Sequence, residues 1–255
     1  MAKDTRQGMG GTPFLEHIQY TFRRVEKKYV LTEETAARVM ERLLPYMDED
    51  QYGRHTIRNI YYDTDDYALI RRSIQKPVYK EKFRLRGYST AEDAQLTFAE
   101  LKKKYKGVVY KRRVAGSAQD IDRLLQGGWL EGEDAQTQRE IHWFLGAYRP
   151  MPRVFIGYER DAFFCREDPL LRVTFDRHIR WRQDDLTLAG GDAGALVLPD
   201  DPVVMEVKIA DAAPLWLARL FSELGVYPAS FSKYGTCYQR YIAPSFLTKA
   251  RTFPC

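Results

Sequence analysis

The sequence predicts one domain of the α+β class, in which antiparallel strands outnumber helices and carry their charges on one face. Three observations support this prediction. Many short segments alternate charged and apolar residues with a period of two, the pattern of strands with two chemically different faces. Fewer segments place apolar residues at helical spacing behind an N-cap residue. A chain of 255 residues, 44% of them hydrophobic, is long enough to bury a sizeable core, and it contains no internal repeat.

The expected strands combine β-branched and aromatic residues with charges at every second position. The stretch KEKFRLRGY is the clearest example, because four cations share one face while Glu81, Phe83 and Leu85 lie on the other. A turn at Gly107 separates two adjoining strands. In chain order, the expected strands are 22–31, 55–63, 80–88, 96–106, 108–116, 153–165, 171–182 and 202–210.

The expected helices have a capping residue before an amphipathic run. Thr32 precedes two acids and then apolar residues at helical spacing, and Ser117 begins a helix that a pair of glycines ends. Asp63 or Thr64 caps a short helix. In chain order, the expected helices are 32–47, 63–75, 117–128, 137–148, 213–224 and 232–242.

We expect the chain to divide into a disordered segment, one folded domain and a tail. Residues 1–13 are polar and rich in glycine, which favours disorder. Residues 14–245 form the domain, and residues 246–255 form the tail. The stretch TLAGGDAG is expected to be a loop and not a linker between domains, because the strand after it carries the same charge pattern as the strands before it.

Composition bounds the class of protein without identifying a partner. The 40 basic and 35 acidic residues give a net charge of +5 and a pI of about 9.0, so the position of the cations matters more than their total. The three cysteines, Cys165, Cys237 and Cys255, form no CxxC pair, which argues against a zinc ribbon or a disulfide framework. With no signal peptide and no apolar run of about 20 residues, we expect a soluble, cytoplasmic protein without a transmembrane segment.

Charged residues gather on one face of nearly every expected strand. Four like charges along one strand repel one another, and a face exposed to water gives no reason to collect them. The residues that share these faces are Arg24, Glu26 and Lys28; Lys80, Lys82, Arg84 and Arg86; Glu100, Lys102 and Lys104; Lys111 and Arg113; Tyr158 and Arg160; Arg172, Thr174, Asp176 and His178; and Glu206 and Lys208.

Two interpretations of this pattern stay open. Each strand could show its charged face to water, as antiparallel sheets commonly do. Alternatively, the sheet curls and the charged faces line a cationic channel. Because desolvated cations are costly unless they are paired, such a channel makes sense if a chain of phosphates and a divalent metal occupy it. Arginine suits phosphate through its planar fork, and lysine suits it as a point charge.

Short motifs add a resemblance to a known family. RVEKKYVL, FRLRGY, FAELKKK, YERDAF, LRVTFD, MEVK and FSKYGTCYQR follow the order seen in the polyphosphate polymerase domain of the vacuolar transporter chaperone (VTC) type, a branch of the triphosphate tunnel (CYTH-like) fold. The resemblance covers roughly residues 20–242. It implies an eight-stranded antiparallel tunnel flanked by helices. It also implies an enzyme that transfers the terminal phosphate of ATP to polyphosphate with Mn²⁺ or Mg²⁺.

The resemblance assigns roles to individual residues. Glu206 matches the metal-binding glutamate, and Glu26 is a second metal candidate. The catalytic candidates are Lys28, Arg84, Arg86, Lys102, Arg160 and Arg172. The substrate-binding candidates are Lys82, Lys111, Arg113, Tyr158, Ser232 and Lys233. Glu100 is expected to balance cations and not to take part in the chemistry.

One position departs from the wider tunnel fold. Hydrolytic relatives begin with Glu-x-Glu-x-Lys, whereas this sequence has Arg24-x-Glu26-x-Lys28. An arginine cannot ligate a cation, which favours the polymerase branch and leaves open whether Glu26 binds metal or a neighbouring base. We find no membrane or phosphate-sensing segment like those of the eukaryotic chaperone. Any link to transport is therefore expected to come from membrane or accessory protein partners, which the sequence does not identify.

The expected partners are ATP, inorganic phosphate and polyphosphate. Two other functions stay open: a hydrolase of tripolyphosphate or nucleoside triphosphates in the same fold, and a non-catalytic module that binds polyphosphate or another polyanion. Nucleic-acid binding is not expected, because a narrow tunnel excludes bases and the sequence carries no recognised nucleic-acid motif.

Overall fold

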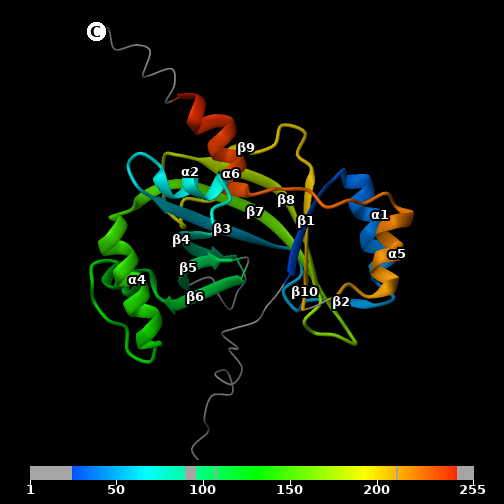
Figure 1. The fold of residues 1–255 in the computed structure, drawn as a ribbon, viewed down its shortest axis with the longest axis horizontal. Coiled ribbons are helices and arrows are strands. Elements are labelled where there is room, and N and C mark those ends of the chain that lie inside the picture. Colours follow the sequence, from blue (N-terminus) through cyan, green and yellow to red (C-terminus); the bar gives the residue numbers. More distant parts are fainter. Residues whose placement is uncertain (1–24, 90–95, 107, 211, 246–255) are drawn as a thin grey trace, which may run out of the picture.

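The computed structural model describes residues 25–89, 96–106, 108–210 and 212–245, and one antiparallel sheet runs through them (Figure 1). Eight of its ten strands follow a single path, with β2 (Met47–Glu49) attached to β7 and β9 (Ala195–Leu196) to β8. This confirms the α+β class. The path is β1 (Val25–Leu31), β10 (Val203–Ile209), β8 (Arg172–Arg182), β7 (Met151–Cys165), β3 (His55–Asp63), β4 (Tyr79–Tyr88), β5 (Thr97–Tyr105) and β6 (Val108–Gly116).

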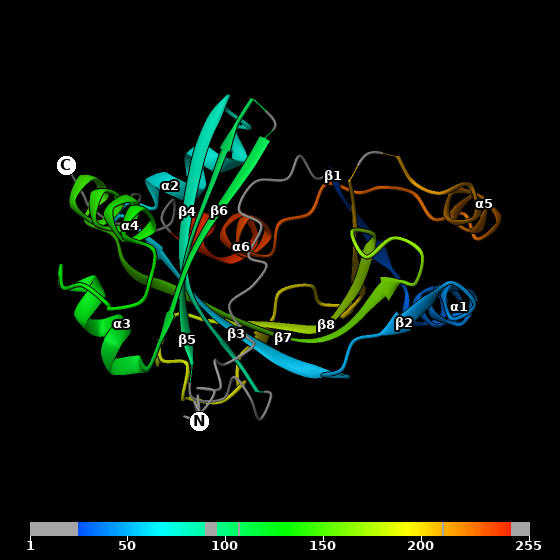
Figure 2. The same ribbon diagram turned by 90° about the horizontal axis from the view of Figure 1, so that it is seen from below.

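The sheet curls into a trough but does not close. Figure 2 shows β4, β5 and β6 as one wall, β3, β7 and β8 as the floor, and β1 on the opposite side. In the described residues β1 and β6, the two ends of the path, form no ladder with each other, so the closed eight-stranded tunnel is corrected to an open ten-stranded sheet. Long charged side chains span the gap instead, because Lys102 Nζ on β5 lies 3.7 Å from Glu26 on β1. We call this concave face of the sheet the trough.

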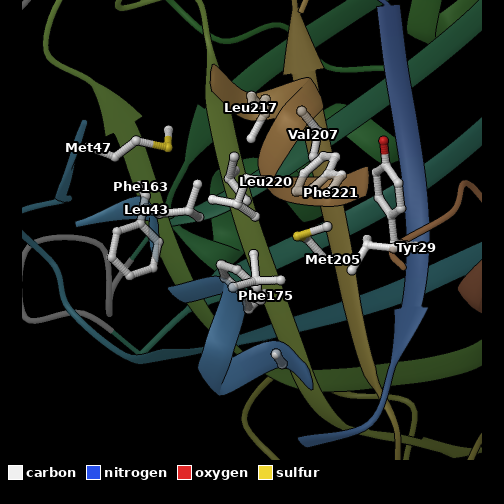
Figure 3. Close-up of a cluster of buried hydrophobic side chains, with 14 of the residues drawn as sticks. Tyr29, Leu43, Met47, Phe163, Phe175, Met205, Val207, Leu217, Leu220 and Phe221 are labelled. Carbon is white, nitrogen blue, oxygen red and sulfur yellow. The ribbon is translucent and has the colours of Figure 1, made fainter. Parts of the chain in front are cut away.

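Helices cover the convex face, where two of the three apolar clusters of the sheet lie. On β1, Lys28 faces the trough while Tyr29 and Leu31 are buried beneath α1 (Glu33–Leu43) and α5 (Leu215–Glu223). Met205 and Val207 on β10 complete this cluster (Figure 3). Because side chains alternate across a strand, burying Tyr29 and Met205 outside turns their neighbours Lys28 and Glu206 inward.

Two more apolar clusters hold the remaining helices. α3 (Ala118–Leu125) and α4 (Ala135–Tyr148) pack against Phe83 and Leu101 on the outside of the β4–β5 wall. α2 (Ala68–Ile74) and α6 (Lys233–Cys237), which continues as a π-helical turn over Tyr238–Ile242, share a cluster with residues of β3 and β7. Tyr234 of α6 stacks on Tyr61 of β3 with ring centroids 4.8 Å apart, and Tyr61 pairs in register with Arg84, so this cluster and α6 lie on the concave face of the sheet.

The expected capping residues are confirmed at the helix starts. Thr32 Oγ1 accepts a hydrogen bond from Thr35 N at 3.2 Å, and Ser117 forms a capping box with Asp120. For α2 the expected start at 63–64 is wrong, because the helix begins at Ala68 with Tyr67 in the N-cap position, yet both candidates accept hydrogen bonds from its amides. Asp63 accepts hydrogen bonds from the amides of the first turn, Leu69 N among them, and Thr64 Oγ1 accepts one from Ala68 N.

Some expectations concern residues that the structure does not describe, and the sequence did not predict two of the strands. The disorder of residues 1–13, the start of the first strand at 22–24, the turn residue Gly107 and the tail at 246–255 lie outside the described residues. The strands β2 and β9 have three and two residues, too few to show a period of two. In the ranges that the structure describes, no helix is long and apolar enough to cross a membrane.

The wall formed by β4 and β5 depends on the ring of Phe83, which is fully buried between Tyr62 and Phe144 at centroid distances of 5.4 and 5.7 Å. Phe83→Ala should lower the free energy of unfolding by about 3–5 kcal/mol, because it leaves a cavity that the surrounding sheet and helix cannot fill. Urea denaturation measures this. The exposed Val78→Ala serves as control and should change stability by less than about 0.5 kcal/mol. A loss below about 1 kcal/mol for Phe83→Ala would contradict the packing described.

Candidate functional site

The strand register brings the charged residues of distant segments onto the trough face. Arg84 pairs with Glu100, and Glu100 in turn pairs with Arg113. At the opposite side of the trough, Lys28 pairs with Glu206. Directly paired residues of an antiparallel ladder point to the same side of the sheet. The charged faces therefore form one continuous surface. Other register pairs on it include Lys82 with Lys102, Lys102 with Lys111, Glu206 with Thr174, Arg160 with Asp176, and Asn59 with Arg86.

Glu100 is the centre of a buried cluster of cations on the β4–β6 wall. Its carboxylate is 2% exposed and accepts from Arg84 Nε at 2.9 Å, while Lys111 Nζ lies 2.6 Å away. Arg86 Nε and Arg113 Nε lie further off, at 3.8 and 3.6 Å. Burial raises the pKa of Glu100, but the surrounding cations lower it more, so its pKa lies well below the ordinary value. Glu100 is therefore ionised, and it holds the guanidinium groups in place.

Neutral side chains orient the two arginines of β4. Tyr61 OH accepts a hydrogen bond from Arg84 Nη1 at 3.0 Å. Asn59 Oδ1 accepts one from Arg86 Nε at 2.9 Å, and Tyr158 OH accepts one from Arg86 Nη2 at 3.3 Å. The two guanidinium planes are thus fixed by groups that add no charge to the trough.

A second cluster joins the floor to α6. Arg160 makes a two-pronged ion pair with Asp176, at 2.6 and 2.8 Å, and Lys233 Nζ contacts the same carboxylate. Lys233 Nζ also lies 3.3 Å from Glu206, which Lys28 Nζ approaches to 3.0 Å. Burial raises the pKa of Glu206, but Lys233, Lys28 and Arg160 lower it more, so its pKa lies well below the ordinary value. Two buried carboxylates therefore share three cations here.

Cations exceed carboxylates along the trough, and two lysines show this directly. Lys82 Nζ donates to Ser232 Oγ at 3.3 Å, and in the part of the chain that the structure describes no carboxylate lies within 4 Å of it. Burial, together with the charges of Lys80, Lys102 and other neighbouring cations, lowers the pKa of Lys82 to about 7. Burial likewise lowers the pKa of Lys208 to about 8. A desolvated cation without a carboxylate partner, as at Lys82, favours anions at this surface.

A comparison with known protein families shows to which family the chain belongs. The family described as VTC domain matches residues 23–242. The chain belongs to the VTC domain family. The resemblance expected from the sequence motifs is thus confirmed.

The fold of this VTC domain is shared with proteins of low sequence identity. A candidate adenylate cyclase from Bacillus halodurans is 14% identical, and the match covers 86% of this chain and 97% of that one with a TM-score of 0.54. A second candidate adenylate cyclase, from Vibrio parahaemolyticus, is 13% identical over 86% of this chain and 98% of that one, with a TM-score of 0.48. The first likeness shows that the fold is shared and no more. No curated protein matches the chain.

In the VTC domain most of the candidate residues come together. One group surrounds Glu26 and Glu206, and its basic members are Lys28, Lys102, Lys233 and Arg160. A second group surrounds Glu100, and its basic members are Arg84, Arg86, Lys111 and Arg113, with Tyr158 hydrogen-bonded to Arg86. Lys82 and Ser232 contact each other beside them. Arg172 differs: it lies at the start of β8, is exposed, and in the described ranges donates to Pro169 O alone, at 3.5 Å.

Sequence reasoning did not assign roles to Asn59, Tyr61, Asp176 or Lys208. Asn59 and Tyr61 occupy alternate positions of β3, a strand with few charges, so no charge pattern marked them. Asp176 and Lys208 stood on charged faces that the alternation had already identified. What the sequence lacked was the pairing that brings Asp176 to Arg160 and α6.

The donor set fits a divalent cation only as a complex with phosphate. In the described ranges no group of three or more His, Cys, Asp or Glu residues is placed to hold a metal ion. Glu26 and Glu206 lie nearest to such a site, because Lys28 Nζ contacts both, at 3.5 and 3.0 Å. Mg²⁺ is commonly held by one or two carboxylates, with phosphate oxygens and water as its other ligands. The two glutamates match that arrangement.

Glu100→Gln keeps the shape of the side chain but removes the charge that Arg84 and Lys111 share. The free energy of unfolding at about pH 7 should fall by about 3 kcal/mol, because buried cations lose their partner. Since folding lowers the pKa of Glu100 from its ordinary 4.5, its ion pairs stabilise the protein above pH 4.5 and are lost as the pH falls further. The difference from wild type, measured by urea denaturation, should therefore shrink at about pH 3.5. A difference that is the same at both pH values contradicts this role.

Lys82→Met should have the opposite effect. Folding lowers the pKa of Lys82 from 10.5 to about 7, so its charge destabilises the fold fully below about pH 7, and the penalty fades as the pH rises toward 10.5. We expect Lys82→Met to raise the free energy of unfolding by about 1–2 kcal/mol at pH 7 and by less at pH 10. Lys27→Met, at an exposed position of β1, is the control. A loss of stability at pH 7 would show that Lys82 has a counterion.

Proposed function

We propose that this VTC domain is a polyphosphate polymerase that transfers the terminal phosphate of ATP to a growing polyphosphate chain in the trough. One observation carries the proposal: cations on the trough face exceed carboxylates, and Lys82 is desolvated with no carboxylate within 4 Å in the described ranges. A polyanion that replaces water around these groups is attracted more strongly than on an open surface, because the effective dielectric constant is lower there. ATP, inorganic phosphate and polyphosphate are the partners in this proposal.

The arginines and two lysines clamp the triphosphate. Phosphoryl transfer needs positioning and neutralisation of charge more than covalent chemistry from the protein. Arg84 and Arg86 present guanidinium groups already oriented by Tyr61, Asn59 and Glu100. Holding these donors in place before substrate binds is what allows them to stabilise charge that develops in the transition state. Arg160 acts from the floor and Lys28 from the far wall, whereas Lys102 lies on the same wall as Arg84 and reaches across toward Glu26. Arg172 acts from the exposed start of β8.

Lysines and polar groups around the clamp bind the remainder of the substrate. Lys82 and Ser232 lie together at the start of α6, and Tyr158 lies beneath Lys233, whose Nζ is 4.4 Å from the centre of its ring. Lys111 and Arg113 extend the basic surface onto β6. The acceptor is a phosphate group that is anionic near neutral pH, so the reaction requires no strong general base.

Glu206 would hold a divalent cation, Mn²⁺ or Mg²⁺, with Glu26 as a second ligand and phosphate oxygens completing the set. When bound, the cation supplies further neutralisation of the phosphate oxygens. Lys28, which now contacts both glutamates, keeps the two carboxylates close together before the metal–phosphate complex arrives.

Incubation with ATP and Mn²⁺ tests the polymerase activity directly, with the product separated on a gel that resolves polyphosphate. Wild type should give a ladder of chain lengths. Arg84→Ala and Glu206→Gln should lower the rate at least about 100-fold, the size of effect expected for an electrostatic group at a transition state. Arg38→Ala and Glu41→Gln on the exposed side of α1 are matched controls and should keep the wild-type rate.

Other outcomes of the same assay would replace the proposal. Orthophosphate release without a ladder would indicate a triphosphate hydrolase. Tight, salt-dependent binding of tripolyphosphate without any metal-dependent turnover would indicate a non-catalytic polyanion module.

A further inference from the structure

The wall of the trough carries lysines in directly opposed pairs at one end. Lys80 on β4 is paired with Lys104 on β5. Two residues further along, Lys82 is paired with Lys102, which also pairs with Lys111 on β6. Like charges directly opposite each other on a sheet destabilise it. Something other than stability therefore accounts for these pairs.

Charge compensation decreases toward this end of the wall. At Arg84 the opposing residue is Glu100, which balances several cations. At Lys80 and Lys104, in contrast, no carboxylate lies within 4 Å in the residues that the structure describes, and Lys80 Nζ donates to the carbonyl of Ser73 at 2.9 Å. Burial lowers the pKa of Lys80, and Lys104, Lys76 and Lys102 lower it further, in agreement with a crowd of cations.

The other end of the same wall has a different character. Its trough face carries Tyr88 and Phe98, and the guanidinium of Arg113 lies over both rings, 5.7 and 3.5 Å from their centres. Over residues 79–88 of β4, the uncompensated basic lining thus continues in one direction only. It extends from Arg84 past Lys82 to Lys80, about 13 Å along the strand.

We propose that Lys76, Lys80 and Lys104, here called the lysine rim, bind the part of a polyphosphate chain that extends beyond the triphosphate clamp, so that the chain leaves the trough past the start of β4. This inference rests on the proposed function. The residue types agree with it, because arginine forks hold phosphate in a fixed geometry, whereas lysine is a flexible point charge that can follow a moving chain. Lys104 and Lys76 are exposed, and Lys80 is half-buried at the mouth, so a chain from the trough meets all three.

Binding of two probes distinguishes the rim from the clamp. Affinities for tripolyphosphate and for polyphosphate of several tens of phosphates are measured by calorimetry for wild type and for K80Q/K104Q. The ratio of long-chain to tripolyphosphate affinity should fall at least fivefold in the variant. K27Q/R38Q removes the same charge from β1 and α1, outside the trough, and should change the ratio less than twofold. K80R/K104R keeps the charge and should restore the wild-type ratio.

Several results would overturn the inference. An unchanged ratio in K80Q/K104Q would do so, and so would an equal fall in K27Q/R38Q, which would indicate an effect of net charge. Loss of binding to phosphatidylserine vesicles with an unchanged ratio would identify the rim as a membrane contact instead. If wild type binds neither probe, the proposed function itself fails, whereas tripolyphosphate binding with an unaffected ratio removes only the rim.

Discussion

The trough depends on Glu100 and Glu206, two buried carboxylates that allow one face of a sheet to carry an excess of cations. Each is surrounded by basic groups from different strands, and each has a pKa well below its ordinary value in spite of burial. Without these charges the guanidinium and ammonium groups around them would be desolvated and unpaired, which proteins rarely tolerate. The compensation is incomplete, however. Lys82 is left without a carboxylate in the described ranges, and this shortage of negative charge is what a phosphate chain is suited to correct.

The sheet supports this arrangement because two of its three apolar clusters face outward, beneath α1 and α5 and beneath α3 and α4. The third cluster lies on the concave face beside α2 and α6. The rest of the concave face is then free to hold polar groups. α6 connects the two regions: Tyr234 belongs to an apolar cluster and donates a hydrogen bond to Asp63, while its neighbour Lys233 contacts Asp176 and Glu206 in the trough. Packing of one short helix thereby fixes a cation of the candidate site.

Membership of the VTC domain family and this charge distribution agree with each other. The family accounts for the order of the motifs, and the geometry gives a physical reason for them: arginines that are oriented in advance, glutamates that share a lysine, and lysines without counterions. The solved structure from Bacillus halodurans is 14% identical with a TM-score of 0.54, so it supports the fold and leaves the chemistry to be inferred from the residues of the trough.

The sequence alone determined which residues share a face, because side chains alternate along a strand whatever its neighbours are. For that reason the cationic face of residues 80–86 and the opposed faces of Lys28 and Tyr29 could be predicted. The helix starts at Thr32 and Ser117 could be predicted from their capping side chains. Only the tertiary structure decided which faces meet. Pairing of Lys28 with Glu206 joins segments far apart in the chain, and the orienting roles of Asn59, Tyr61 and Asp176 appear only after β3, β7 and β8 pair. The open edge between β1 and β6 was also decided there, since closure depends on the curl of the whole sheet and no local pattern records it.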